Sequence, residues 1–121
     1  MKKIIFTFLF LSVLLSCNAQ KTETLQKIDV KTFKKAVSKE KVQLVDVRTP
    51  REYRQDHVEN AININYFSDN FKTKFQKLDK NKPVYIYCRS GVRSGKASKI
   101  LVKLGFKKIF DLKGGFLAYK R

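Results

Sequence analysis

Short apolar runs alternate with segments of helical periodicity along most of this 121-residue chain, and this alternation constrains the fold more than any other feature of the sequence. Runs rich in β-branched and aromatic residues predict strands, whereas apolar residues spaced three and four apart predict helices. Strands that alternate with helices favour an α/β fold in which helices cover both faces of a parallel sheet. The expected strands are 27–30, 42–47, 61–64, 84–87 and 108–111.

Capping residues and helix breakers mark the predicted helices. Pro50 suits the first turn of a short helix that ends near Gln55, and Gly105 is a stop signal after a helix over 94–104. Gly114-Gly115 indicates a turn into a short closing helix. The expected N-caps are Asp29 or Thr32 in the first helix and Ser68 in the third, which carries Phe67, Phe71, Phe75 and Leu78 on one face.

Residues 1–16 have the pattern of a bacterial export signal. Lys2 and Lys3 precede an apolar run of about a dozen residues, which is shorter than the roughly 20 that a membrane-spanning helix needs. The motif Leu14-Leu15-Ser16-Cys17 resembles the lipobox of bacterial lipoproteins. That resemblance implies cleavage before Cys17 and lipidation of its side chain, whereas an ordinary signal cleaved near Ala19 would release a soluble periplasmic protein.

Cleavage before Cys17 divides the chain into three parts. These are a signal peptide over 1–16, the lipidated Cys17 with a polar tether over 17–26, and a folded domain over 27–121. Two or more acyl chains anchor a protein stably to a membrane. We therefore expect a lipid-anchored protein of the bacterial cell envelope that faces the periplasm or is held at the outer membrane.

Basic residues outnumber acidic ones by 27 to 10, which gives a formal net charge of +17, or +15 once Lys2 and Lys3 are removed. Such a surface favours small anionic substrates and acidic lipid headgroups. The lysines are scattered and no nucleic-acid-binding motif accompanies them, so we expect no nucleic-acid partner. One histidine and two widely separated cysteines make no metal site, and we expect no metal, no cofactor and a monomer.

The segment after the fourth expected strand carries the reactive chemistry. Ligands of parallel sheets bind at the carboxyl ends of the strands. A helix N-terminus, two arginines and a glycine that lets backbone N–H groups converge all favour a bound anion, and the same features favour the thiolate form of a cysteine. We therefore predict a nucleophile that attacks an anionic substrate, in a loop formed by Cys88, Arg89, Ser90, Gly91, Val92, Arg93 and Ser94.

Several short motifs in fixed order resemble the rhodanese family over nearly the whole domain. They are Leu44-Val-Asp-Val-Arg48, Glu52-Tyr53, His57-Val58, Ala61-Ile-Asn-Ile64, the Cys88 loop, Gly105-Phe106, and Leu112-Lys-Gly-Gly115 with Ala118. The resemblance implies a rhodanese-like domain with a five-stranded parallel sheet and helices on both faces. It also implies a sulfurtransferase, in which the cysteine takes sulfane sulfur from a donor such as thiosulfate, becomes a persulfide and passes the sulfur to cyanide or a thiol.

The resemblance assigns roles to the loop residues. Cys88 forms the persulfide, and the N–H groups from Arg89 to Ser94 hold the anionic donor and then the persulfide sulfur, as an oxyanion hole holds oxygen. Arg93 is expected to bind the sulfonate end of a donor such as thiosulfate, and Arg89 is the second candidate for that contact.

Three polar residues outside the loop are expected to support the site. Asp46 lies at the end of the second expected strand and Arg48 follows that strand. We expect both to lie behind the site, with Arg48 paired to Glu52. His57 is assigned a structural role, because an ionised thiolate needs no general base.

Other activities fit parts of this pattern. Phosphatases of related fold place one residue more between Cys and Arg than the four that separate Cys88 from Arg93, so the shorter loop favours sulfur transfer. A second alternative is a non-catalytic docking or sulfur-carrier module. Rhodanese domains that serve as docking units typically lack the cysteine, which this chain retains. Dithiol redox chemistry needs a second thiol, and Cys17 is expected to be lipidated. The predicted partners are a small anionic sulfur donor, a thiol or cyanide acceptor, and a membrane.

Overall fold

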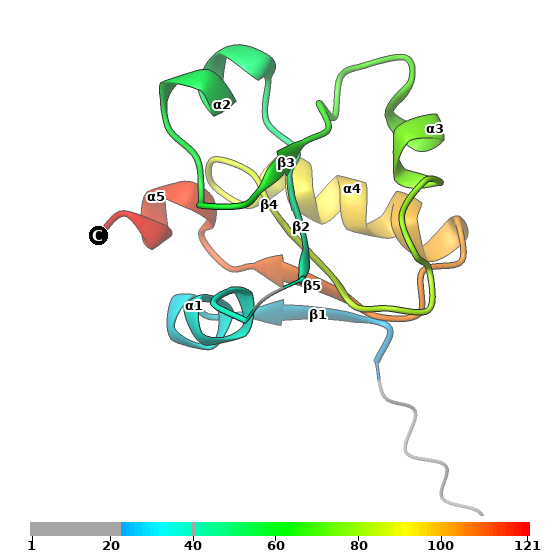
Figure 1. Cartoon of the computed structure of the whole chain (residues 1–121), viewed down its shortest axis with the longest axis horizontal. Helices are drawn as coiled ribbons and strands as arrows, with labels where there is room; N and C mark the ends of the chain where they lie inside the picture. The colour runs from blue at the N-terminus through cyan, green and yellow to red at the C-terminus, as the bar shows by residue number, and fades with distance from the viewer. Residues whose placement is uncertain (1–22, 40) are drawn as a thin grey trace, which may run out of the picture.

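A computed structural model describes residues 23–39 and 41–121, which form one five-stranded parallel sheet (Figure 1). The strands lie in the order β1-β5-β4-β2-β3. The α/β class and the parallel five-stranded sheet expected from the sequence are confirmed, whereas the expected signal peptide and Cys17 lie outside the described residues. The strands are β1 (Leu25–Ile28), β2 (Gln43–Asp46), β3 (Ile62–Asn63), β4 (Val84–Tyr87) and β5 (Ile109–Leu112).

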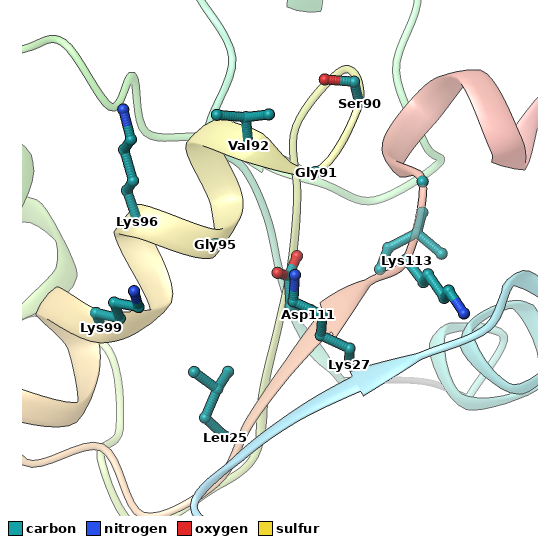
Figure 2. Close-up of a pocket in the computed structure, with 12 residues that line it drawn as sticks. Leu25, Lys27, Ser90, Gly91, Val92, Gly95, Lys96, Lys99, Asp111 and Lys113 are labelled. Carbon is teal, nitrogen blue, oxygen red and sulfur yellow. The ribbon is translucent and has the colours of Figure 1, made fainter.

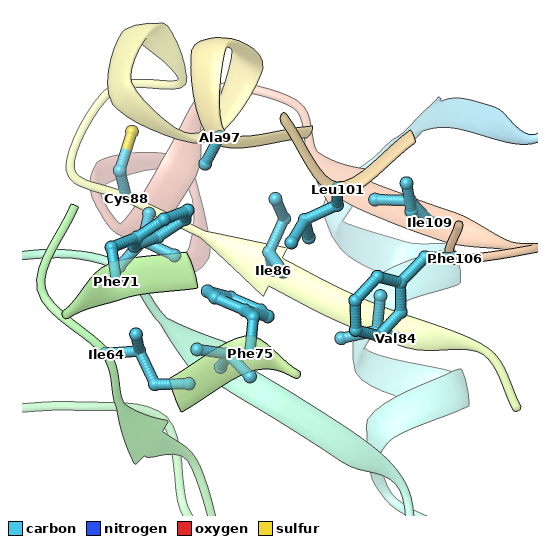
Figure 3. Packing of buried hydrophobic residues seen from close by; sticks show 12 residues of the cluster. Ile64, Phe71, Phe75, Val84, Ile86, Cys88, Ala97, Leu101, Phe106 and Ile109 are labelled. Atoms are coloured by element: carbon cyan, nitrogen blue, oxygen red, sulfur yellow. The ribbon is translucent and has the colours of Figure 1, made fainter. Parts of the chain in front are cut away.

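Helices cover both faces of this sheet. Alternate residues of β4 face opposite sides, so that Ile86 and Tyr87 enter two separate core clusters. One cluster gathers side chains of α3 and α4 (Figure 3), and the other contains Phe33 of α1 with Tyr119 of α5 packed against it. The helices are α1 (Val30–Val37), α2 (Pro50–Gln55), α3 (Phe71–Phe75), α4 (Val92–Lys103) and α5 (Gly115–Tyr119). No helix in 23–39 or 41–121 has the length and apolar character needed to cross a bilayer.

Several predicted helix ends are confirmed. The Asp29 carboxylate accepts a hydrogen bond from the Thr32 N–H at 2.8 Å and caps α1. Pro50 is the first residue of α2, which ends at Gln55 as expected. Gly105 follows α4 with a φ of +96°, the left-handed conformation that commonly terminates a helix.

Two elements begin earlier than the sequence predicts. β1 begins at Leu25 rather than at residue 27, because Leu25 pairs with Ile109 and β1 follows β5 along its whole length. The expected tether over 17–26 therefore overlaps the sheet by two residues, Leu25 and Gln26. α4 begins at Val92 rather than at residue 94, because Gly91 turns the backbone at the N-cap position with a φ of +107°.

α3 is shorter than its apolar spacing predicts, and the expected N-cap Ser68 is wrong. Asn70 occupies the cap position, and the Ser68 carbonyl oxygen accepts the Phe71 N–H instead. The preceding segment forms a side-chain turn in which the Asn65 amide oxygen accepts the Phe67 N–H at 3.0 Å. Such local bonds compete with helix formation, and they leave Phe67 65% exposed outside the core.

A buried polar cluster fixes the end of β4. The Asp46 carboxylate accepts hydrogen bonds from the Arg48 guanidinium, at 2.7 Å from Nη2, and from the Tyr87 hydroxyl at 2.8 Å. The expected pair between Arg48 and Glu52 is therefore wrong. Arg48 turns back onto Asp46 and lies 4.3 Å above the ring of Phe116, because a fully buried carboxylate needs a charged partner and hydrogen-bond donors.

Candidate active site

Cys88 lies at the carboxyl end of β4, the central strand of the sheet. Its side chain is 1% exposed and belongs to the core cluster that also contains Phe71 and Ala97. The sulfur points toward the beginning of α4 (Figure 3), and the Gly91 N–H donates to Sγ at 3.0 Å. The thiol therefore lies at the bottom of a strand-to-helix loop and already receives one backbone hydrogen bond from it.

The rest of the loop divides into a buried and an exposed part. Ser94 is fully buried, and its hydroxyl donates to the Gly91 carbonyl oxygen at 3.3 Å. The Gly95 N–H donates to the same oxygen at 3.1 Å. Ser90 is exposed and Val92 is 64% exposed, so both stand at the rim. Of the sequence-predicted residues, Gly91 and Ser94 thus shape the interior of the loop, while Ser90 and Val92 border its mouth.

The beginning of α5 holds the first half of the loop in place. The Phe116 N–H donates to the Cys88 carbonyl oxygen at 2.8 Å, and the Leu117 N–H donates to the Arg89 carbonyl oxygen at 3.1 Å. A Cβ on Gly115 would lie 2.5 Å from the Arg89 carbonyl oxygen, so only glycine permits this approach. The N–H of a trans peptide points away from its own carbonyl, and the N–H groups of Arg89 and Ser90 are thereby directed away from α5.

Arg93 forms a two-point ion pair with Glu52 of α2. Its Nη1 lies 2.6 Å from Oε1 and its Nη2 lies 2.9 Å from Oε2, with the two side chains 20% and 25% exposed. The Arg93 guanidinium holds the pKa of Glu52 at about 2, against an ordinary value of 4.5, and backbone and side-chain hydrogen bonds from Thr49 act in the same direction. Both terminal nitrogens of the arginine expected to bind the donor are thus already engaged.

Sequence reasoning missed Glu52 as a partner of the loop, although a local signal was present. Thr49 and Glu52 form a capping box at the start of α2, a motif with the spacing Ser/Thr-x-x-Glu. This box orients the Glu52 carboxylate, and the fold brings Arg93 to it from α4. Only the capping box can be read from the sequence, because the contact with Arg93 joins segments 41 residues apart.

Arg89 differs from Arg93. Its side chain is exposed and makes no hydrogen bond or ion pair to any residue in 23–39 or 41–121. It follows Cys88 directly in the sequence, and its guanidinium carries a positive charge that no described residue pairs. Arg89, the second candidate for the donor contact, is therefore the loop arginine that has no competing partner in the described structure.

The other polar residues singled out from the sequence lie around the site rather than in it. Asp46, which is paired with Arg48, accepts a hydrogen bond from the Tyr87 hydroxyl. The same hydroxyl accepts the Val58 N–H at 3.0 Å. Burial and the Asp46 carboxylate raise the pKa of Tyr87. Tyr87 was missed because nothing in the sequence distinguishes it from an ordinary core tyrosine.

His57 lies two residues after the end of α2. Its ring stacks on Tyr53 with a centroid separation of 3.8 Å, and its Nδ1 is 2.8 Å from the Tyr53 carbonyl oxygen. Across the described part of the chain, no three His, Cys, Asp or Glu side chains are grouped so that they could share a metal ion.

Comparisons with known proteins agree with this geometry. A family model described as Rhodanese-like domain matches residues 29–121. The chain is 34% identical over 84 residues to the thiosulfate sulfurtransferase GlpE of Coxiella burnetii, which covers 69% of this chain and 77% of that one. It also resembles the crystal structure of a rhodanese-like domain protein from Staphylococcus aureus, with a TM-score of 0.69, 32% identity, and coverage of 78% of this chain and 90% of that one.

Two further relatives are matched over a smaller part of their length. The chain is 43% identical over 76 residues to the uncharacterized protein YqhL of Bacillus subtilis, covering 63% of this chain and 59% of that protein. It is 36% identical over 94 residues to the tRNA uridine(34) hydroxylase of Pelagibacter ubique, covering 76% of this chain and 31% of that protein. The shared part is thus one region within longer proteins.

The contact between α5 and the loop predicts the effect of Gly115→Ala. The added methyl group would overlap the backbone of Cys88 and Arg89 and would require a φ of +62°, so we expect the free energy of unfolding to fall by more than about 2 kcal/mol. Gly95→Ala is the matched control, since a Cβ at that position meets nothing within 4 Å. This substitution should stabilise α4 by up to about 1 kcal/mol. Urea unfolding measures both, and equal stability of the two variants would contradict the contact.

The Glu52–Arg93 pair predicts a specific dependence of stability on pH. Because the folded pKa of Glu52, about 2, is below its ordinary value of 4.5, the pair contributes stability above that ordinary value and loses it as the pH falls toward 2. Between about pH 6 and pH 3 we expect the wild type to lose roughly 1 kcal/mol more than Glu52→Gln, after allowing for solvent screening. Urea unfolding at each pH measures these stabilities. An equal loss of stability in the wild type and in Glu52→Gln would rule the pair out as a stabilising contact.

Proposed function

The chain belongs to the rhodanese-like domain family, and from this premise we propose that it is a sulfurtransferase that carries sulfane sulfur on Cys88. The observation that carries the proposal is the geometry around the thiol, which receives the Gly91 N–H at the end of β4. The N–H groups of Arg89 and Ser90 are directed away from α5, since their peptide carbonyls are bound there. The similarity to a protein named thiosulfate sulfurtransferase supports thiosulfate as a donor.

The proposed cycle has two steps. The Cys88 thiolate attacks the sulfane sulfur of thiosulfate, the S–S bond breaks, and sulfite leaves with the bonding electron pair. Cyanide or a thiolate then attacks the outer sulfur of the persulfide, and the Cys88 thiolate is the leaving group. The Gly91 N–H, which donates to the thiol, would stabilise negative charge on sulfur in both steps, and we assign the same task to the N–H groups of Arg89 and Ser90.

We assign different tasks to the two arginines of the loop. Arg93 is a positioning residue, since its pair with Glu52 ties the first turn of α4 to α2. Arg89 is free to meet the sulfonate end of the donor as it approaches. This division explains how the loop can retain a fixed shape and still offer a positive charge to an anionic donor.

The proposal predicts that Cys88→Ser abolishes sulfur transfer from thiosulfate to cyanide without unfolding the protein, because a hydroxyl cannot form a persulfide. Thiocyanate formation measures the activity, and urea unfolding checks the fold. Turnover of an aryl phosphate by the wild type should be negligible, since the loop is one residue shorter than that of the related phosphatases. Thiocyanate formation that survives in a folded Cys88→Ser protein would refute the mechanism.

The division between the arginines predicts different kinetic effects of their removal. Arg89→Ala should raise KM for thiosulfate by about 5-fold or more with little change in stability, because it removes ground-state attraction at an exposed position. Arg93→Ala should mainly lower kcat and stability, because it leaves Glu52 unpaired and loosens the loop. The reverse pattern, with KM raised only in Arg93→Ala, would show that Arg93 leaves Glu52 to bind the donor.

A docking or sulfur-carrier module is a second candidate, because a thiol that is 1% exposed has little access to acceptors in solvent unless a partner opens the site. The chain also matches only one part of longer proteins, among them a tRNA uridine(34) hydroxylase. Such a match is compatible with a domain that assists the activity of another domain or protein. A persulfide that forms but is discharged by neither cyanide nor small thiols would identify this function.

We further propose that Cys17 is lipidated and anchors the domain in the bacterial cell envelope. The support is the motif Leu14-Leu15-Ser16-Cys17 after the apolar segment. Bacteria that express the full chain should incorporate labelled palmitate into the wild type and into the control variant Cys88→Ser, but not into Cys17→Ser. An unlabelled wild-type protein in the soluble periplasmic fraction would instead indicate an ordinary signal peptide.

A further inference from the structure

A cavity of about 420 Å³ lies beside the Cys88 loop, between α4, β1 and the turn before α5 (Figure 2). Ser90 and Gly91 of the loop, Gly95 of α4 and Asp111 of β5 are among its lining residues, and Cys88 is not. The cavity therefore borders the loop without containing the reactive sulfur. Its volume lies within the range of sites for small organic ligands.

Asp111 gives this cavity a buried carboxyl group. The residue is 1% exposed, and its Oδ1 has no hydrogen-bond partner among residues 23–39 and 41–121. Burial raises the pKa of Asp111, while the Ser94 hydroxyl and the Lys27 ammonium act in the opposite direction. Buried carboxylate oxygens are nearly always hydrogen-bonded, so an occupant of the cavity that offers an N–H donor would satisfy this group.

Gly95 leaves the α4 wall of the cavity open. A Cβ built at this position meets nothing within 4 Å, and the residue lies in the interior of a 12-residue helix. Glycine in a helix interior costs about 1 kcal/mol relative to alanine. The space beside Asp111 therefore exists in part because this position carries no side chain.

Four lysines surround the cavity and make its rim positive. All four are exposed, and none takes part in the three ion pairs of the described residues. They come from three different segments, which are β1, α4 and the turn before α5 (Figure 2). These lysines are Lys27, Lys96, Lys99 and Lys113.

We propose that this cavity binds a small zwitterion of the acidic amino acid type, with its ammonium group on Asp111 and its carboxylates on the rim lysines. The charge pattern carries the proposal. A simple dianion would meet the Asp111 carboxylate, and a simple amine would meet the lysines, whereas a zwitterion with one ammonium and two carboxylates complements both. Ser90 and Gly91 form part of the wall, so the bound molecule also contacts the loop that holds Cys88.

Equilibrium dialysis of the full chain in detergent micelles, with radiolabelled L-glutamate as the probe, tests the proposal. We expect saturable binding in the millimolar range or tighter, and at least about 10-fold weaker competition by N-acetyl-L-glutamate, which lacks the ammonium group. Asp111→Asn should weaken binding by a similar factor. Lys99→Ala should weaken it several-fold, whereas Lys72→Ala on α3, which removes the same charge outside the cavity, should leave it unchanged.

Gly95→Leu provides an independent variant that does not disturb Asp111. Its Cβ enters open space, so the helix should remain folded while the larger side chain occupies the cavity and blocks L-glutamate. Absence of saturable binding by the wild type would overturn the proposal. Equal competition by N-acetyl-L-glutamate, or binding unaffected in both Asp111→Asn and Gly95→Leu, would overturn it as well.

Discussion

The hydrogen bonds between the start of α5 and the backbone of Cys88 and Arg89 are the constraint on which the site depends. They exist because β5 lies next to β4 in the sheet, so the segments that follow the two strands meet at the same edge. Gly115 lets these segments approach to a distance that no other residue permits. The carbonyl oxygens are then bound on one side, and the N–H groups are directed to the other. The side of the loop to which these N–H groups are directed thus follows from the topology of the sheet as much as from the loop's own residues.

Two ion pairs organise the charges around this loop. Arg48 neutralises the fully buried Asp46, whose carboxylate accepts the hydroxyl of Tyr87, the residue before the thiol. Arg93 is neutralised by Glu52 in a partly exposed pair. The Gly91 N–H donates to the Cys88 sulfur, and Arg89 is the loop arginine that no residue of 23–39 or 41–121 neutralises. Fixed dipoles such as this N–H group stabilise a charge without the cost of reorganising at the moment of reaction.

The features that could be predicted from the sequence are those that depend on the local pattern of residues. The strands, the Asp29 cap, the stop at Gly105 and the strand-to-helix position of Cys88 all follow from periodicity and capping rules. Contacts between distant segments could not be predicted in the same way. They include the Arg93–Glu52 pair, the approach of Gly115 to Arg89 and the position of Asp111 under α4. The expected Ser68 cap failed for a local reason, because the turn made by Asn65 competes with the helix.

The central claim is that Cys88 accepts sulfane sulfur, and the intact mass of the protein tests it most directly. The intact mass of the full chain, purified in detergent, is measured by mass spectrometry before and after incubation with thiosulfate. The account predicts a gain of one sulfur atom, about 32 Da, which cyanide removes and which Cys88→Ser never shows. No gain with thiosulfate, polysulfide or a persulfidated thiol, or a gain that persists in Cys88→Ser, would contradict it.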